Sequence, residues 1–313
     1  MPTRIFVAAD VGATLLSVLR NDPRFELSYF PARTAEELMT RLGDAEVLVT
    51  RHHNRLTAAV LDAAPRLRLV AQGTSGLDNI DVEHAARRNV TVAGLPGENA
   101  NAVAELVLGH IIALTRDVPA YNEMVRSGRW ERDDCVTKRE LRSFRLGIVG
   151  LGRVGSSVAA LARRFGMSVG AYDPYLRSED FVNRGVQRFD TLEEMLQGTD
   201  ILTMHVPLTR ETRQMIGRKE LEMLPSRSFV INASRGAVLD QNALFALLHD
   251  DLIAGAALDV FDQEPPKLTE WPAREKLILT PHIAGCSKES KESIGLGLYQ
   301  LICNFLSIKP HVT

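Results

Sequence analysis

The sequence has little cysteine, and the three cysteines that it has are Cys135, Cys286 and Cys303. They lie far apart and form no Cys-x-x-Cys pair, so the sequence offers neither a disulfide framework nor the ligand spacing of a zinc site. We therefore expect a reducing compartment and no metal.

Long hydrophobic runs and a surplus of charge of one sign are absent as well. The longest uncharged stretch in the early helical region, residues 106–115, is too short to span a bilayer. With 37 basic and 39 acidic side chains, the formal net charge is −2, which argues against a nucleic-acid partner or an anionic membrane partner. An acidic residue already stands at position 10, too early for a signal peptide, so we expect a cytoplasmic protein.

What the chain does contain is an alternation of strand and helix patterns. At 313 residues with 45% apolar side chains, it is long enough for two domains, each with its own core. In the N-terminal third, short runs rich in Val, Ile and Leu predict strands over residues 4–9, 46–50, 66–72 and 90–95. Helical spacing over 34–42 and 56–64 completes a strand–helix–strand rhythm, which is typical of a parallel sheet with helices on its faces.

A long helical pattern then interrupts this rhythm. Apolar side chains at 103, 106, 107, 111 and 114 follow helical spacing, and Pro96-Gly97 opens a helix long enough to pass from one domain into another. A second series of strands is predicted over 145–150, 168–173, 200–206, 228–234, 254–260 and 277–284, and a last helix over 288–308. We therefore predict two doubly wound α/β domains, with residues 98–287 inserted into a domain made of residues 1–97 and 288–313.

The inserted segment carries a glycine pattern, GLGRVG at 150–155, between an apolar strand and an Ala-rich helix. Gly150 permits the tight turn, Gly152 lets the main chain approach a pyrophosphate, and Gly155 lets the helix pack closely on the strand. The helix N-terminus then points its N–H groups at the phosphates. Because a glycine turn in any strand–helix unit can look the same, the interpretation depends on context.

Asp173 supplies that context, because it ends the next strand, eighteen residues after Gly155. A carboxylate at this strand tip accepts hydrogen bonds from ribose hydroxyls, and it repels a 2′-phosphate by roughly 1–4 kcal/mol for unit charges about 4 Å apart. Arg177 stands four residues later and could soften that repulsion, although a solvated loop position is its ordinary role. The pattern favours NAD over NADP as the cofactor.

Three charged or titratable side chains follow apolar strands of the inserted domain, namely Arg235, Glu264 and His282. Each also has an ordinary structural explanation: a surface ion pair for the arginine, a solvated carboxylate before two prolines, and a buried carbonyl as the partner of the histidine. Together they are the set that hydride exchange with a 2-oxo acid requires.

The chemistry of that exchange suggests a role for each group. Negative charge develops on the carbonyl oxygen as hydride reaches the carbonyl carbon, and His282 can donate a proton to it because histidine changes charge near neutral pH. Glu264 would orient that ring, and the planar guanidinium of Arg235 would hold the substrate carboxylate with two parallel hydrogen bonds. Oxidation of the hydroxy acid uses the same groups in reverse.

With these residues in place, the sequence resembles the D-isomer-specific 2-hydroxyacid dehydrogenases. The motifs that carry the resemblance are LDNID (77–81), NANAVAEL (99–106), GLGRVG (150–155), HVPLTRET (205–212), INASRG (231–236), ALDVFDQEPP (257–266) and TPHIAG (280–285). The resemblance covers roughly residues 45–300. It implies a Rossmann-type NAD domain inserted into a discontinuous, flavodoxin-like substrate domain, and a homodimer that the long helix helps to form.

The resemblance also implies roles for single residues. The catalytic triad of the family falls on Arg235, Glu264 and His282. Asp173 would contact the ribose of NAD, and Asp259 would reach the nicotinamide carboxamide. The full set of implied cofactor contacts is Gly150, Gly152, Arg153, Val154, Gly155, Asp173, Val206, Pro207, Thr212, Ala233, Asp259 and Gly285.

Further substrate contacts are implied at Arg51, Ser75 and Gly76, in the N-terminal region. The carboxylate-binding loop of the family usually reads Gly-Val-Gly or a close variant, whereas residues 74–76 here read Thr-Ser-Gly. Main-chain N–H groups can still bind a carboxylate there, and the Ser75 side chain can change which substrate tail is accepted. Arg51 matches an arginine of phosphoglycerate-type members and could bind a carboxylate or a phosphate.

The sequence therefore predicts an NAD-dependent oxidoreductase that interconverts a small D-2-hydroxy acid and its 2-oxo acid. Candidates are a hydroxypyruvate/glyoxylate reductase and a short phosphoglycerate dehydrogenase. The alternative is an NAD(H)-sensing, corepressor-like interaction protein on the same fold, which would retain the triad. His52, His53 and Cys286 have no assigned role, and we expect Cys286 to be a small packed thiol.

Overall fold

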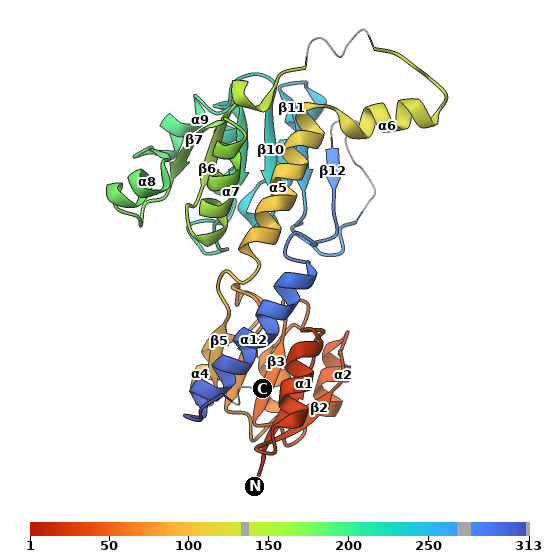
Figure 1. Cartoon of the computed structure of the whole chain (residues 1–313), viewed down its shortest axis with the longest axis vertical. Helices are drawn as coiled ribbons and strands as arrows, with labels where there is room; N and C mark the ends of the chain where they lie inside the picture. The colour runs from red at the N-terminus through yellow and green to blue at the C-terminus, as the bar shows by residue number, and fades with distance from the viewer. Residues whose placement is uncertain (133–137, 268–276, 311–313) are drawn as a thin grey trace. The chain divides into compact units, whose positions relative to one another are not determined.

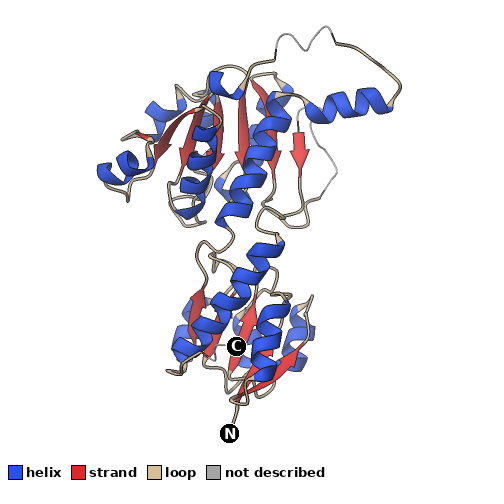
Figure 2. Ribbon diagram, viewed as in Figure 1, coloured by secondary structure: helices blue, strands red, loops and turns tan. Residues whose placement is uncertain are grey.

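Two parallel β-sheets, each with helices packed on it, organise the protein (Figures 1 and 2). The computed structural model describes residues 1–132, 138–267 and 277–310. Each sheet belongs to one unit: unit 1 comprises residues 1–99 and 286–313, and unit 2 comprises residues 100–285. The sequence predicts these divisions at 97/98 and 287/288.

Unit 1 contains a five-stranded sheet of order β2-β1-β3-β4-β5, in which every pairing is parallel. The strands are β1 (Thr3–Val7), β2 (Phe25–Tyr29), β3 (Val47–Thr50), β4 (Leu69–Gln72) and β5 (Thr91–Gly94). The helices are α1 (Ala13–Asn21), α2 (Ala35–Leu42), α3 (Ala58–Asp62), α4 (Val82–Arg87) and α12 (Lys288–Phe305). This strand order is that of flavodoxin-like folds.

Alternate side chains of the unit 1 strands enter two separate cores, one on each face of the sheet. On β1, Ile5 and Val7 share a core with residues of α1 and α12, whereas Phe6 shares a core with residues of α2 and α3. Consecutive strand residues point to opposite faces, so a strand that is apolar at each position is covered on both sides. Helix α12 thus packs on a sheet built from residues 3–94.

Unit 2 contains a seven-stranded parallel sheet of order β12-β11-β10-β9-β6-β7-β8. The strands are β6 (Arg145–Val149), β7 (Ser168–Tyr172), β8 (Gln187–Arg188), β9 (Ile201–Met204), β10 (Ser228–Asn232), β11 (Ile253–Leu258) and β12 (Leu277–Leu279). The helices are α5 (Ala100–Thr115), α6 (Val118–Arg126), α7 (Arg153–Arg164), α8 (Ser178–Arg184), α9 (Leu192–Leu196), α10 (Arg218–Glu222) and α11 (Gln241–His249).

The order of these strands is that of a dinucleotide-binding fold. Counted from β6, it reads 3-2-1-4-5-6 with one further strand at the end. The chain reverses direction across the sheet between β6 and β9, and ligands of such sheets bind at the carboxyl ends of the strands near that point. On β6, Leu146 and Ile148 join one core and Val149 joins the other, so both faces are covered. The predicted fold class, two doubly wound parallel-sheet domains, is confirmed.

The predicted long helix after Pro96-Gly97 is divided in two. Helix α5 ends at Thr115 and α6 begins at Val118, with Asp117 between them in the left-handed conformation (φ 49°). Pro119 explains the break, because its ring would collide with the carbonyl group four residues earlier and it lacks an N–H to continue the helix. The side chains of α6 are not buried in this chain, in contrast to those of α5.

The sequence predicts no residue ranges for strands β2 and β8 or for helices α1, α4, α8, α9, α10 and α11. Strand β2 lies at the edge of its sheet and buries one of its five side chains, and β8 is an edge strand of two exposed residues. Neither strand needs the continuous apolar run that marks a central parallel strand. None of the helices in the described parts of the chain is long and apolar enough to cross a membrane.

Candidate active site and cofactor loop

The three candidate catalytic residues follow three neighbouring strands of unit 2. Arg235 comes after β10, Glu264 after β11 and His282 after β12, and these strands pair in parallel in the order β12-β11-β10 (Figure 1). The carboxyl ends of parallel strands lie at one edge of a sheet, so the fold brings the three loops to the same edge.

His282 and Glu264 form a close pair. The Nδ1 atom of the imidazole lies 2.7 Å from Oε2 of the carboxylate, and the other carboxylate oxygen accepts a hydrogen bond from the backbone N–H of Phe261 at 3.1 Å. The side chains are 25% and 35% exposed, so the pair is partly withdrawn from water. The carboxylate therefore fixes both the position of the ring and the nitrogen that carries its proton on that side.

Arg235 is held by a loop that a buried asparagine organises. The side-chain amide of Asn232, which is fully buried, donates to the carbonyl of Arg235 at 2.9 Å. Its amide oxygen accepts hydrogen bonds from the backbone N–H and the hydroxyl of Ser234. The guanidinium donates to the Ser234 carbonyl at 2.8 Å. These hydrogen bonds fix the turn at residues 232–235 and with it the main chain of Arg235.

Asp259 anchors the turn that carries His282. Its carboxylate is 1% exposed and accepts hydrogen bonds from the Thr280 hydroxyl (2.6 Å) and from the backbone N–H groups of Ile283 (2.9 Å) and Ala284 (2.8 Å). Its backbone carbonyl accepts the N–H of His282 at 2.8 Å. These bonds hold His282 in a left-handed conformation (φ 54°), which is uncommon for a residue other than glycine. The expected contact of Asp259 with a nicotinamide carboxamide stays a prediction.

The glycine loop between β6 and α7 has room for a ligand where the sequence expects one. A Cβ atom at Gly155 would lie 2.1 Å from the carbonyl oxygen of Gly150, so only glycine allows this approach of α7 to the loop. At Gly152, which caps α7, a Cβ atom would meet no other protein atom within 4 Å. The main chain before α7 is therefore open to a bound group, next to the N-terminal N–H groups of a twelve-residue helix.

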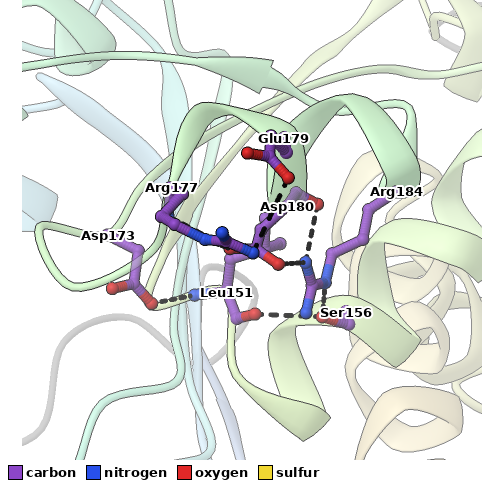
Figure 3. Close-up of polar contacts among 7 residues, drawn as sticks. All are labelled: Leu151, Ser156, Asp173, Arg177, Glu179, Asp180 and Arg184. Carbon is purple, nitrogen blue, oxygen red and sulfur yellow. Dashed lines mark hydrogen bonds and ion pairs between the residues drawn. The ribbon is translucent and has the colours of Figure 1, made fainter.

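Asp173 is fixed against this loop (Figure 3). One carboxylate oxygen accepts the backbone N–H of Leu151 at 2.9 Å, and the other accepts that of Tyr175 at 3.0 Å. An ionised carboxylate has about four acceptor positions, so each oxygen can still accept a ribose hydroxyl. The geometry fits the dinucleotide reading of the sequence.

Arg177 is turned toward two acids rather than toward Asp173 (Figure 3). Its guanidinium lies 3.6 Å from the Glu179 carboxylate and 3.7 Å from the Asp180 carboxylate. Nearby, Arg184 donates to the hydroxyl of Ser156, which in turn donates to the Leu151 carbonyl, and so ties α8 to the glycine loop. The guanidinium of Arg177 thus faces these two acids in the structure.

The remaining cofactor candidates of unit 2 line or support the same edge. Val206 follows β9, and its side chain is what a Cβ atom at Gly150 would meet at 2.7 Å. The Thr212 hydroxyl donates to the Pro207 carbonyl at 2.5 Å and so closes the loop after β9. The others lie at the start of α7, just after β10 and at the end of unit 2: Arg153, Val154, Ala233 and Gly285.

The substrate candidates lie in unit 1, after β3 and β4. Arg51 is 8% exposed and donates to the Asp10 carbonyl at 3.3 Å. The Ser75 hydroxyl donates to the Leu95 carbonyl at 3.3 Å and accepts the N–H of Gly97 at 3.2 Å. This side chain therefore ties its loop to the segment that follows β5. Gly76 follows it in the same loop.

Other residues that the sequence singled out have no site of their own. Burial lowers the pKa of His53, whose ring contacts that of His52 edge-on. Cys286 is exposed, so the expectation of a packed thiol is wrong: the residue lies where the chain leaves unit 2, just before the cap of α12. Cys303 is buried, and Cys135 lies outside the described residues. Within the described residues, no cluster of three side chains that could hold a metal ion is found.

A comparison with known families agrees with this geometry. Residues 108–284, more than half of the chain, match the domain described as "D-isomer specific 2-hydroxyacid dehydrogenase, NAD binding domain". The chain belongs to the D-isomer-specific 2-hydroxyacid dehydrogenase family. The resemblance that the motifs suggested is confirmed.

Known members of this dehydrogenase family match over most of the chain. D-3-phosphoglycerate dehydrogenase of Methanocaldococcus jannaschii is 36% identical over 266 residues, which are 84% of this chain and 50% of that protein. Glyoxylate reductase of Korarchaeum cryptofilum is 36% identical over 298 residues, which are 93% of this chain and 89% of that protein. The chain spans about half the length of the first relative and most of the second.

A solved structure of the family has the same fold. D-lactate dehydrogenase from Aquifex aeolicus, complexed with NAD and lactic acid, has a TM-score of 0.86 and 26% sequence identity, and the match covers 97% of this chain and 96% of that one.

Three polar residues of this family member were not singled out from the sequence: Asn232 and His110, which are buried, and Thr280, which is partly buried. Asn232 and Thr280 organise the loops of Arg235 and His282. His110, on α5, is 5% exposed; burial lowers its pKa, against the opposing attraction of Asp259. A polar residue at the end of a buried strand was a visible signal for Asn232. A histidine in an otherwise apolar helix was one for His110.

Proposed function

We propose that this protein is an NAD-dependent oxidoreductase that interconverts a small D-2-hydroxy acid and its 2-oxo acid. The observation that carries the proposal is the 2.7 Å contact between His282 and Glu264, on the same sheet edge as the Arg235 loop. A histidine paired with a carboxylate can move a proton, and an arginine can hold a carboxylate. The relatives are named as dehydrogenases and reductases, which favours an enzyme over a redox-sensing interaction protein.

The residues around the glycine loop fit NAD. The open space at Gly152 suits a pyrophosphate at the start of α7, and the Asp173 carboxylate suits two ribose hydroxyls. The same carboxylate disfavours a 2′-phosphate, and Arg177 is occupied by acids. When bound, the nicotinamide of NAD supplies the hydride for reduction or accepts it in oxidation.

The acid/base step is assigned to the histidine ring. Because Nδ1 is engaged by Glu264, we assign proton transfer with the substrate oxygen to Nε2 of His282. During reduction, His282 gives a proton to the oxygen that gains charge, and Glu264 stabilises the ring while it is charged. Arg235 binds the substrate carboxylate and holds the carbonyl group beside the ring. In the reverse direction, His282 removes the hydroxyl proton.

Unit 1 is the proposed substrate unit. Main-chain N–H groups of Ser75 and Gly76 are proposed to receive the substrate carboxylate, since the serine hydroxyl is already used within the loop. Arg51, whose side chain is mostly buried, is proposed to bind a carboxylate or a phosphate group of the substrate. A homodimer and a cytoplasmic location also remain proposals, supported by the family resemblance and by the composition.

The test is NADH oxidation with a panel of 2-oxo acids: glyoxylate, hydroxypyruvate, pyruvate and phosphohydroxypyruvate. We expect turnover with at least one of them, and a loss of about 10²–10⁴-fold in kcat in His282→Gln. His249→Gln, which changes an exposed histidine of the same unit, is the matched control and should keep full activity. Tight NADH binding without turnover of any of these acids would refute the proposed oxidoreductase activity and support an NAD(H)-sensing interaction protein.

A further inference from the structure

Gly236 is the point at which the Arg235 loop touches the loop that carries Glu264. A Cβ atom at Gly236 would lie 2.0 Å from the carbonyl carbon of Phe261, 2.1 Å from its oxygen and 2.5 Å from the nitrogen of Asp262. Real Cβ atoms do not come this close to a peptide group, and backbone cannot turn aside as a flexible side chain can. The φ angle of Gly236 is not in the left-handed region, so glycine is needed here for space and not for conformation.

Phe261, whose carbonyl group Gly236 contacts, also holds the catalytic acid through its own N–H, on the other side of its Cα atom. The backbone N–H of Phe261 donates to one oxygen of the Glu264 carboxylate at 3.1 Å, and the other oxygen meets Nδ1 of His282 at 2.7 Å. Phe261 itself is 8% exposed and belongs to a core of unit 2, so this part of the loop is fixed by packing. A short chain of contacts therefore runs from Gly236 through Phe261 to Glu264 and His282.

We propose that Gly236 is a positioning residue that sets the place of the Glu264–His282 pair, an inference that rests on the proposed function. To reach even the shortest contact that real Cβ atoms make, about 3.0 Å, the peptide group at 261–262 must retreat by about 1 Å from any side chain at 236. The N–H of Phe261, which holds Glu264, is joined to that peptide group through the Phe261 Cα atom and shifts with it. A displacement of about 1 Å costs on the order of 10²-fold in rate when it misplaces catalytic groups.

The same glycine also links the two halves of the site. It directly follows Arg235 in the chain, so its contact with Phe261 sets the spacing between the carboxylate-binding guanidinium and the acid/base pair. A side chain at 236 would spread the loops after β10 and β11 without changing any group that reacts. We therefore expect a loss of turnover with little loss of cofactor binding.

The kinetic experiment compares Gly236→Ala with Gly109→Ala. Gly109 lies on α5, and a Cβ atom there would meet no other protein atom within 4 Å, so the same methyl group is added without a contact. In Gly236→Ala, kcat should fall about 30- to 100-fold, while the dissociation constant of NADH stays within about threefold of wild type. Gly109→Ala should match wild type in both. Unchanged kcat in a folded Gly236→Ala protein would overturn the proposal.

A second readout needs no activity. The ring nitrogens of ¹⁵N-labelled histidine report by NMR which of them carries a proton, and His282→Gln identifies the signals of His282. In Gly236→Ala these signals should move toward those in Glu264→Gln, whereas in Gly109→Ala they should stay as in wild type. Wild-type His282 signals in Gly236→Ala would refute the positioning role. If the wild-type protein reduces no 2-oxo acid, the proposed function fails, and the ring signals still decide the positioning role.

The close approach can be tested without any substitution, in case Gly236→Ala does not fold. The wild-type protein should show a nuclear Overhauser contact between the α-protons of Gly236 and the amide of Asp262. The amide resonance of Phe261 should shift in Glu264→Gln, because it loses its charged acceptor. Absence of either signal would overturn the proposal, and presence of both supports it.

Discussion

His205 gives the protein a specific sensitivity to acid. It follows β9, its Nε2 lies 3.0 Å from the Thr203 hydroxyl, and its Nδ1 is buried without a hydrogen-bond partner among the described residues. Burial lowers the pKa of His205 from 6.5 to about 3. The native state therefore holds this ring neutral, whereas the unfolded chain protonates it near pH 6.5.

The sign and size of the effect follow from this difference. Between pH 6.5 and about 3 the unfolded state binds the additional proton, so the free energy of unfolding falls as the pH falls. One group contributes at most about 1.4 kcal/mol for each pH unit. Between pH 6.5 and 4.5 this amounts to about 2 kcal/mol, because the unfolded histidine is only half protonated at pH 6.5. Well above pH 6.5 the contribution is constant. His205→Gln removes the titration, so the variant should lose about 2 kcal/mol less than wild type over the same interval.

Urea unfolding followed by far-ultraviolet circular dichroism measures this difference, because the strands and helices around His205 contribute to the signal. Comparing the slopes of stability against pH removes any constant cost of the substitution. His249→Gln, at an exposed histidine, should retain the wild-type slope. Equal slopes for His205→Gln and wild type would refute the reasoning.

Three further predictions concern the site. Glu264→Gln removes the charge 2.7 Å from the His282 ring, so the alkaline limb of kcat for 2-oxo acid reduction should move to lower pH; an unmoved limb would contradict the assigned role. Asp173→Ser should raise the NADPH/NADH ratio of kcat/KM about tenfold or more, and an unchanged ratio would count against the ribose contact. Asp259→Asn places an amide N–H₂ group opposite backbone N–H donors, so it should lower the free energy of urea unfolding by about 1–3 kcal/mol. Asp262→Asn is the control, and an Asp259→Asn protein as stable as this control would disprove the anchoring role.

The strands were predictable where both faces of the sheet are buried, because such strands are apolar at consecutive positions. β3, β4, β6 and β9 are central strands, covered on both sides, and their continuous apolar runs were found. The edge strand β2 was missed because most of its side chains face water. The apolar spacing up to Leu114 does not reveal the break after α5, which Pro119 causes.

The contact between Glu264 and His282 was predictable from the strand order, whereas the hydrogen bonds that hold the surrounding loops were not. Parallel strands bring Glu264 and His282 to one edge, so a contact between them followed from the motifs. The Asp259 carboxylate and the Ser75 hydroxyl bond to nearby backbone groups, and such partners depend on the shape of each loop. The role of Gly236 depends on a distance between two loops that no single motif contains.

The split composition of unit 1 has a consequence for the order in which the chain folds during synthesis. Leu15 and Leu19, translated before unit 2, share their core with Leu298 and Ile302 on α12, translated after it. All of unit 2 is translated between them and can complete its own sheet while it emerges from the ribosome. Unit 1 must meanwhile keep an apolar face uncovered. Nascent chains stopped before α12 should therefore recruit chaperones through their first hundred residues.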